Sequence, residues 1–463
     1  MSVTSDSFEV IIDWLRTQRW YGDKSRSLDS YSFGSLGTVD VASSRVELLT
    51  VDCGFGDGGS SSYFVPIELE ASGRIRVDSI VDAFEMSEFR DWFVDGFGHG
   101  RVVPGAGRTT RWVWGRGAEA VSGRAGDARL LRSEQSNTSI LCGDRAIAKV
   151  FRRLQPGPNP DVEIIKYLTE ETDFRHVPRH VGTVVIESDH ADDRVTLAAV
   201  QGFIANRGDG WTWLLHELEG EPERSWSHLS ESIELLGTRT AELHLALASP
   251  TVDTAFSAEV MGPREFDSLV RRLIEELDET ISSLLASKVR TQSALGELRK
   301  GVARKVATVH PLVGFPKIRI HGDYHLGQVL RTTSDFAIID FEGEPSRSMA
   351  QRREKSSPLK DVAGMLRSLD YAVATCERAE GELTGTTIRE WGVRASEAFL
   401  KGYTMSIRTS HRTIVPTEGH DLEAALDFFM IEKALYEVRY ELDNRPEWLE
   451  IPLRALETIA SRP

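Results

Sequence analysis

Apolar residues in the second half of the chain recur at helical spacing. Between residues 266 and 285 they fall at every third or fourth position, with arginine, glutamate and aspartate on the other face. A similar pattern runs over 358–373, where Pro358 suits a first helical turn, and over 421–444. These patterns predict three long packing helices, and the chain from about residue 207 onward is expected to be mainly helical.

The first half of the chain has shorter apolar runs between glycine-rich turns. Residues 45–51 and 63–69 have the composition of strands, and the Gly/Ser stretch between them indicates a loop. Residues 1 to about 130 are therefore expected to alternate strands with turns. Residues 130 to about 205 are expected to form a second β-rich unit that holds one helix.

The bulk composition is that of a globular protein with more than one domain. A chain of 463 residues is too long for one ordinary core. The net charge of −16 and the pI near 5.3 argue against nucleic acid or a membrane surface as a partner. No apolar run approaches ~18 residues, so no membrane span is expected. The first ten residues show no signal-peptide pattern and the three cysteines form no C-x-x-C, which predicts a cytoplasmic protein with reduced thiols.

Residue types that can take part in catalysis or bind a metal concentrate in one segment near position 330. It reads His-Gly-Asp-Tyr-His-Leu-Gly-Gln over 321–328, and Ile-Ile-Asp-Phe-Glu over 338–342. Residues 318–320 are expected to be a strand that enters this loop. Residues 329–332 are expected to pair with 336–339 around a polar turn, with Val329 facing Ile339.

In that register Gln328 lies across from Asp340. An amide oxygen and a carboxylate side by side make a hard-oxygen site that suits Mg²⁺. Asp323 stands five residues before Gln328 on a loop, where it could accept a hydroxyl proton. A base followed by two metal ligands is the layout of kinase-type phosphoryl transfer.

Kinase-type transfer also needs a lysine on the phosphates and a carboxylate that holds it. Residues 145–151 are strand-like and present Lys149, and a helix that starts at Pro160 has Glu163 in its first turn. The segment 133–139 offers hydroxyl and amide donors to phosphate oxygens, but it contains no glycine, so alone it is a weak signal. Its candidate contacts are Ser136, Asn137 and Thr138.

A hinge for adenine is expected where composition turns helical. Residues 195–200 have a strand pattern, and Gln201 and Phe203 follow them. Taken alone, each of these candidate ATP-binding segments also has the composition of an ordinary strand or turn. The chain order of the whole set, from loop and lysine through hinge to base and metal ligands, favours the ATP-binding interpretation.

These motifs resemble those of bacterial maltokinases over nearly the whole chain. The resemblance lies in the run 318–371, in Gln-Arg-Trp-Tyr-Gly-Asp-Lys at 18–24, in Glu-Gln-Ser-Asn-Thr-Ser at 134–139, and in Asn-Arg-Pro at 444–446 with Ile-Pro-Leu-Arg at 451–454. Tyr324 is a departure, because leucine is more usual there.

The resemblance implies an α+β, bilobal eukaryotic-kinase-like fold similar to that of aminoglycoside kinases. It implies an N-terminal cap over 1–90, a β-rich nucleotide-binding lobe over 91–205, and a helical lobe over 206–463. It also implies that ATP and Mg²⁺ are used to convert maltose to maltose 1-phosphate. Trehalose synthase is then a candidate partner.

Carried onto matching positions, the resemblance gives each candidate a role. Asp323 would be the base, Gln328 and Asp340 would hold Mg²⁺, and Lys149 would contact the phosphates while paired with Glu163. His321 is expected to brace the loop through a bond to the backbone. His325 and Glu342 would either support these groups or touch the sugar.

An acceptor sugar needs polar groups and an aromatic surface. The polar side of helix 421–444 offers both, although a solvated face with a Glu–Arg pair would look the same. Its candidate substrate residues are Glu432, Tyr436, Arg439 and Tyr440.

Other charged and aromatic positions have simpler interpretations. Asp361 is expected to be a first-turn carboxylate that satisfies the helix dipole. The basic segment 346–357 takes the place of an activation segment, and contact with phosphate or with a partner and a solvated loop explain it equally well. Trp20 and Tyr21 are expected to pack inside the cap, with Lys24 exposed.

Three functions remain open from the sequence. The first is a maltose kinase, and the second is a kinase for another small acceptor such as glucosamine, because actinobacterial glucosamine kinases share these motifs. The third is a kinase-shaped module that only binds or regulates. It ranks last, because the base, the lysine and both metal ligands are all present.

Overall fold

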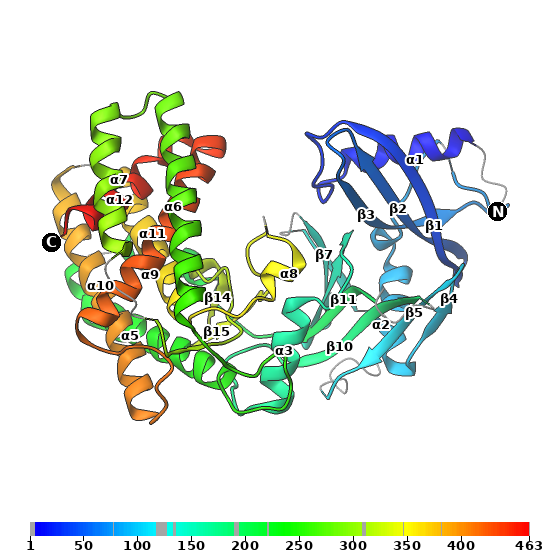
Figure 1. Ribbon diagram of the computed structural model, residues 1–463. Helices are drawn as coiled ribbons and strands as arrows, with labels where there is room; N and C mark the ends of the chain where they lie inside the picture. The colour runs from blue at the N-terminus through cyan, green and yellow to red at the C-terminus, as the bar shows by residue number, and fades with distance from the viewer. Residues whose placement is uncertain are drawn as a thin grey trace. The chain divides into compact units, whose positions relative to one another are not determined.

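The computed structural model describes residues 5–76, 78–116, 127–132, 136–188, 194–219, 222–307, 312–345, 347–380 and 382–462. The chain divides into two compact units (Figure 1). Unit 1 comprises Met1–Glu171 and Pro178–Ile204, and unit 2 comprises Thr172–Val177 and Ala205–Pro463. Residues 133–135 of the predicted phosphate loop and Ser346 lie outside the described residues.

Unit 1 begins with a helix on an antiparallel sheet. The strand order is β1-β2-β3-β9, and the central strand β2 alternates its side chains between two cores. Val46 and Leu48 face one core, while Leu49 and Val51 face the other together with side chains of α1. Both faces of β2 are therefore buried. The elements are α1 (Ser5–Thr17), β1 (Leu28–Val41), β2 (Ser44–Phe55), β3 (Ser60–Leu69) and β9 (Arg153–Leu154).

A seven-stranded sheet forms the rest of unit 1. Its order is β4-β5-β10-β11-β8-β7-β6, and α2 packs its aromatic side chains into the same core. The predicted strands and single helix over residues 130–205 are confirmed by β6–β11 and α3, but these strands share sheets with β3, β4 and β5 of the preceding segment. The elements are η1 (Ala83–Glu85), α2 (Ser87–His99), β4 (Val102–Pro104), β5 (Arg108–Trp114), β6 (Ala128–Leu131), β7 (Asn137–Cys142), β8 (Ala146–Phe151), α3 (Pro160–Glu171), β10 (His180–Ser188) and β11 (Val195–Gly202).

The expectation of strands and turns alone over the first 130 residues is wrong, because α1 and α2 are helices. Both carry a helical signal: apolar residues fall at 8, 11, 12 and 15 in α1, and phenylalanines at 89, 93 and 97 in α2. The neighbouring glycines and aromatic residues, which favour strands and turns, masked it.

Unit 2 is mainly helical, as predicted. The three predicted long helices correspond to α6, α9 and α11, and α11 packs against α9, α6 and α12 (Figure 1). The elements are α4 (Gly210–Leu218), α5 (Pro222–Leu247), β12 (Glu259–Val260), α6 (Pro263–Ala286), α7 (Gln292–Ala307), β13 (Pro316–Lys317), η3 (Leu326–Gln328), β14 (Val329–Arg331), β15 (Phe336–Ile338), α8 (Met349–Arg352), α9 (Leu359–Glu380), α10 (Glu382–Thr409), α11 (Gly419–Asn444), η4 (Pro446–Trp448) and α12 (Glu450–Ser461).

The hairpin that carries the candidate metal ligands differs from the prediction by one residue. Val329 pairs with Ile338, not with Ile339, because the turn takes four residues and closes through the Thr332 N–H to the Asp335 carbonyl at 2.9 Å. A slip of one residue normally moves a side chain to the other face. Here Asp340 lies beyond the paired strands and adopts a left-handed backbone, φ 67°, which aspartate tolerates better than most residues.

The structure tests two further predictions, one for residues 318–320 and one for Trp20, Tyr21 and Lys24. Residues 318–320 form no strand of their own, since Ile318 makes a single bridge to Ser356. Trp20 and Tyr21 are buried and Lys24 is exposed, as predicted.

Cys53, Cys142 and Cys376 are buried thiols outside any disulfide. Among the described helices, none has the length and apolar character needed to cross a membrane.

Candidate active site

The loop from His321 to Gln328 is held in place by the first turn of α9. The Asp361 carboxylate, 1% exposed, accepts the backbone N–H groups of His321 at 2.7 Å and Gly322 at 2.9 Å. It also contacts His244 Nε2 at 3.2 Å. Gly322 has a φ of 85°, which favours glycine. Asp361 therefore fixes the turn that leads directly into Asp323, and its interpretation as a plain first-turn carboxylate is wrong.

The remaining anchors of this loop are also buried. His321 Nε2 lies 2.9 Å from the Ile339 carbonyl, which confirms the predicted bond to the backbone. The Tyr324 hydroxyl lies 2.9 Å from Thr240 Oγ1 of α5, so the departure from leucine adds a hydrogen bond in the core. A side chain at Gly364 of α9 would meet the Tyr324 carbonyl at 2.6 Å. The loop thus sits tightly between α5 and α9.

Asp323, the candidate base, has a cationic neighbour that the sequence did not indicate. Lys433 of α11 lies 3.2 Å from Asp323 Oδ1 and 3.3 Å from Glu344 Oε1. Burial lowers the pKa of Lys433, but the carboxylates of Asp323 and Glu344 outweigh burial and raise the net pKa above its ordinary value. Lys433 is therefore a cation at neutral pH that lies within hydrogen-bond distance of the candidate base.

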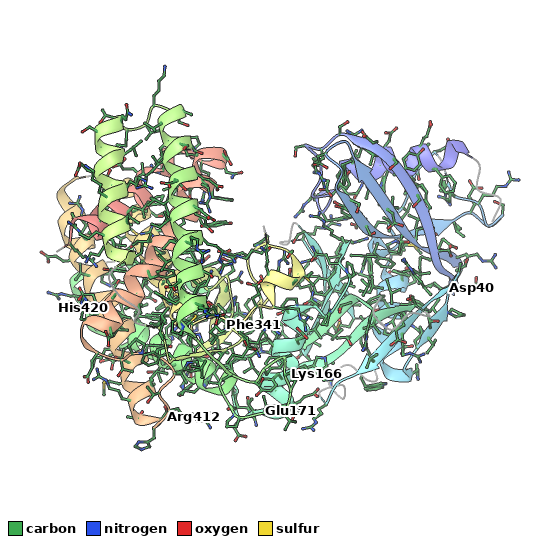
Figure 2. All side chains as sticks on the ribbon, in the orientation of Figure 1. Asp40, Lys166, Glu171, Phe341, Arg412 and His420 are labelled. Carbon is green, nitrogen blue, oxygen red and sulfur yellow. The ribbon has the colours of Figure 1, made fainter. Side chains whose placement is uncertain are left out.

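Gln328 and Asp340 meet as predicted. Gln328 Nε2 donates to Asp340 Oδ2 at 3.1 Å, although the two residues come together through the turn after β15 and not across the ladder. Next to Asp340, the ring of Phe341 (labelled in Figure 2) packs against the imidazole ring of His321, with the two ring centres 4.7 Å apart. The amide and carboxylate oxygens are donors that suit Mg²⁺, which proteins commonly hold with one or two carboxylates plus substrate phosphates.

His325 and Glu342 flank these groups. His325 caps η3, because its Nδ1 accepts the Gly327 N–H at 3.0 Å, and its Nε2 lies 4.0 Å from Asp323 Oδ2. This places His325 beside the candidate base. Glu342 lies half-buried in the turn that follows Asp340. A contact of either residue with a sugar stays a prediction.

A cavity of about 310 Å³ lies in unit 2 between α11, α9, α6 and the basic segment. Lys433 lines it and contacts Asp323, so the cavity borders the candidate base. Tyr436 and Phe429 give it aromatic walls. Three of the predicted substrate residues are among its lining: Glu432, Tyr436 and Arg439.

The alternative interpretation, a Glu–Arg pair on a solvated face of this helix, does not describe the partners of Arg439 and Glu432. Arg439 instead reaches α6, where Nη2 lies 3.2 Å from Glu276 Oε2 and Nη1 lies 3.1 Å from Thr280 Oγ1. Glu432 accepts from Lys360 Nζ of α9 at 2.8 Å. Tyr440 is 44% exposed and does not belong to the cavity lining described above. Its ring stacks 6.3 Å from that of Tyr436.

The basic segment is tied into unit 2 by acidic partners. Arg347 donates to Glu344 at 2.6 Å, and Lys355 contacts Glu259 at 2.7 Å. The short helix α8 within the segment starts at a capping box made by Ser348 and Gln351. Arg347 and Gln351 of the segment line the cavity, whereas Ser348, Ala350 and Glu354 are exposed, so the segment contributes to the cavity and is also partly solvated.

The candidate nucleotide residues all lie in unit 1. Lys149 is on β8, between Ser139 of β7 and Ala199 of β11, and its ammonium lies 5.9 Å from the centre of the Phe151 ring. Glu163 is in the first turn of α3, as predicted. The pairing of Lys149 with Glu163 stays a prediction.

The predicted phosphate loop is partly buried. Ser136 is exposed and Asn137 starts β7. Thr138 is buried, and its hydroxyl accepts from Arg152 Nε at 2.7 Å. Arg152 in turn pairs with Asp82 at 2.6 Å. The Thr138 hydroxyl keeps its own hydrogen to donate, so a role for these three residues at phosphate stays a prediction.

The predicted hinge residues use several of their polar groups inside unit 1. The Gln201 side chain donates to Asp161 Oδ2 of α3 at 2.7 Å. The Phe203 N–H donates to the Arg145 carbonyl at 2.7 Å. A contact of adenine with Phe203 would therefore use the carbonyl or the ring, which belongs to a residue 37% exposed.

Glu344 makes the stability of unit 2 depend on pH. Burial raises the pKa of Glu344, but Lys433, Lys360 and Arg347 outweigh burial and lower the net pKa below the ordinary 4.5. The stabilisation is therefore complete above pH 4.5 and is lost as the pH falls through the lowered pKa. We expect Glu344→Gln to cost about 2 kcal/mol at pH 7, with the difference from wild type shrinking below pH 4.5, measured by urea unfolding at several pH values.

The control for this prediction is Glu297→Gln, which removes the negative charge from an exposed ion pair with Lys300 on α7, 2.9 Å long. We expect the control to change the free energy of unfolding by about 0.5 kcal/mol or less. A Glu344→Gln difference that stays constant from pH 7 to pH 3 would show that the Glu344 charge does not stabilise the fold.

A scan of known protein families finds no match to the chain. Among curated proteins, glucosamine kinase from Streptacidiphilus jiangxiensis is 29% identical over 348 residues, 73% of each chain. Glucosamine kinase from Mycolicibacterium smegmatis is 28% identical over 333 residues, 71% of this chain and 78% of that protein.

Solved structures of glucosamine kinase have the same fold as this chain. One crystal form has a TM-score of 0.69 at 22% identity, over 95% of both chains. A complex of glucosamine kinase with glucosamine, ADP and inorganic phosphate has a TM-score of 0.68 at 21% identity, over 99% of this chain and 100% of that one. These structures confirm the predicted α+β, bilobal kinase-like fold.

Proposed function

We propose that this protein is an ATP-dependent kinase that phosphorylates a hydroxyl group of a small sugar. The observation that supports the proposal best is the position of Asp323 on a rigid loop at the edge of a polar cavity with aromatic walls. A carboxylate there can orient a sugar hydroxyl and take its proton. The polar groups and aromatic rings of the cavity are those that bind the edges and faces of sugar rings.

The donor in this proposal is ATP with Mg²⁺. Gln328 and Asp340 would hold the metal, which neutralises the phosphate charge when bound. The 3.1 Å contact between Gln328 Nε2 and Asp340 Oδ2 supports this assignment, because the two side chains lie together and the Gln328 amide would only need to turn to present its oxygen to the metal. Lys149 would bind the phosphates and Glu163 would hold Lys149.

The first candidate acceptor is maltose, which the motif resemblance indicates. The product would then be maltose 1-phosphate, with trehalose synthase as a candidate partner and a cytoplasmic location. The second candidate acceptor is glucosamine, which is favoured by a specific observation: both curated relatives described above are glucosamine kinases.

A screen of acceptors with Mg-ATP tests the proposal. ADP release would be measured with maltose, glucosamine, glucose and an aminoglycoside, and the products would be identified by mass spectrometry. We expect sugar-dependent ADP release with maltose or with glucosamine. Turnover of glucosamine without turnover of maltose would overturn the first candidate. ATP binding without turnover of any acceptor would support the module that only binds or regulates.

A further inference from the structure

The charged side chains that line the cavity bear on which of the two candidate acceptors would fit it. Among the described residues, its cationic side chains outnumber its glutamates five to three. The carboxylate of Asp361 is also part of the lining, but it is directed at the backbone of the loop and at His244. The cations are Arg272, Arg347, Lys360, Lys433 and Arg439, and the glutamates are Glu276, Glu344 and Glu432.

Each of the three glutamates already has a cationic partner from the protein. Glu276 pairs with Arg439 at 3.2 Å. Glu344 pairs with both Arg347 and Lys433. Glu432 pairs with Lys360 at 2.8 Å.

An ammonium group that entered this cavity would have to displace one of these cations or remain close to them. Like charges at short range disfavour binding, and loss of hydration adds to the cost when no carboxylate compensates for it. A neutral sugar hydroxyl meets no such obstacle, because it can donate to a paired carboxylate and accept from a lysine or arginine.

Lys360 is the partner whose removal would change this balance most simply. Glu344 would keep a second cation if either of its partners were removed. Among the described residues, Glu432 would keep only the more distant Arg347 Nη2, at 3.7 Å, which is too far for a hydrogen bond. Lys360 lies in the first turn of α9 and lines the cavity together with Glu432, with side chains 18% and 22% exposed, so an incoming ligand meets the ion pair and not a bare carboxylate.

We propose that the Lys360–Glu432 ion pair is a specificity determinant that makes this cavity select uncharged sugars over amino sugars. The proposal rests on the proposed function in one respect, since it takes the cavity beside Asp323 as the acceptor site. It assigns Lys360 the role of occupying the carboxylate that a sugar ammonium would need. Replacement of Lys360 by an uncharged residue therefore creates an ammonium site at Glu432.

The test compares glucose with glucosamine, which differ in the group at carbon 2. Wild type and Lys360→Met would be assayed as full chains with Mg-ATP, and kcat/KM would be measured for each sugar. We expect wild type to prefer glucose and maltose. We expect the ratio of glucosamine to glucose kcat/KM to rise about tenfold or more in Lys360→Met, because a charged hydrogen bond to Glu432 becomes available.

The matched control is Lys401→Met. It removes the lysine from an ion pair with Glu234 that has the same 2.8 Å length and lies outside the cavity. We expect it to leave the glucosamine to glucose ratio unchanged. Preference of the wild type for glucosamine, or an unchanged ratio in Lys360→Met, would overturn the proposal.

Calorimetric titration with the same sugars separates this proposal from the kinase proposal. If no sugar is phosphorylated, the kinase function fails, while the ratio of binding constants still measures the selectivity. A rise of that ratio in Lys360→Met supports the ion-pair proposal without turnover. Absence of binding of every sugar to both proteins would overturn it, because the cavity would then not be a sugar site.

Discussion

Asp323→Asn is expected to lower kcat by about 10³-fold, with nucleotide affinity within a few-fold of wild type. An amide cannot accept the acceptor's proton, whereas its shape and its contact to Lys433 through the remaining oxygen are kept. Lys433 also keeps Glu344 at 3.3 Å, so the substitution leaves no buried cation unpaired. Steady-state kinetics with saturating sugar and calorimetric titration with ADP measure the two effects separately.

The control is Asp278→Asn, on the exposed face of α6 where Asp278 pairs with Arg299 at 2.6 Å. It removes the same charge from unit 2 at a distance from the cavity, and kcat is expected to stay within about twofold of wild type, since exposed ion pairs contribute little to the fold. Near-normal turnover by Asp323→Asn would show that another group is the base.

The elements of unit 2 could be predicted well because their signals are local. The helix over 266–285 shows its apolar stripe in the sequence, and the observed helix α6 extends it by a few residues at most. The contact between Gln328 and Asp340 could also be predicted, because a short hairpin holds both within twelve positions. The register could not, because a three-residue and a four-residue turn fit the same polar cluster.

The residues that the sequence failed to indicate act over long separations. Lys433 is 110 positions from Asp323, and on a helical wheel it looks like any lysine on a polar stripe. Lys360 is 72 positions from Glu432. Asp361 looked like a first-turn carboxylate because sequence does not show burial, and its 1% exposure and its bonds to His321 and Gly322 depend on how α9 packs against the loop.

Asp361→Ala is expected to combine a large loss of stability with a loss of activity that is larger than unfolding explains. The carboxylate satisfies two backbone N–H groups and His244, and truncation leaves buried donors without an acceptor at about 1–3 kcal/mol each. We therefore expect a loss of about 3–5 kcal/mol, in the range for breaking a buried charged network. Urea unfolding at pH 7 would measure it.

The activity loss follows from geometry, since the Gly322 N–H that Asp361 holds is adjacent to Asp323. A shift of the base by about 1 Å can cost about 10²-fold in rate. Kinetics measured in conditions where the variant is folded would isolate this effect. Asp361→Asn retains one acceptor oxygen and should fall between wild type and Asp361→Ala in both measurements.

The control for Asp361→Ala is Asp443→Ala, which truncates an aspartate at an exposed position near the end of α11. Its free energy of unfolding is expected to stay within about 0.5 kcal/mol of wild type. If Asp361→Ala lost stability but kept the kcat of wild type, Asp361 would support the fold without positioning the loop. The rigid support of Asp323, and with it the argument that this aspartate is held ready as a base, would then have to come from Tyr324 and Gly364 instead.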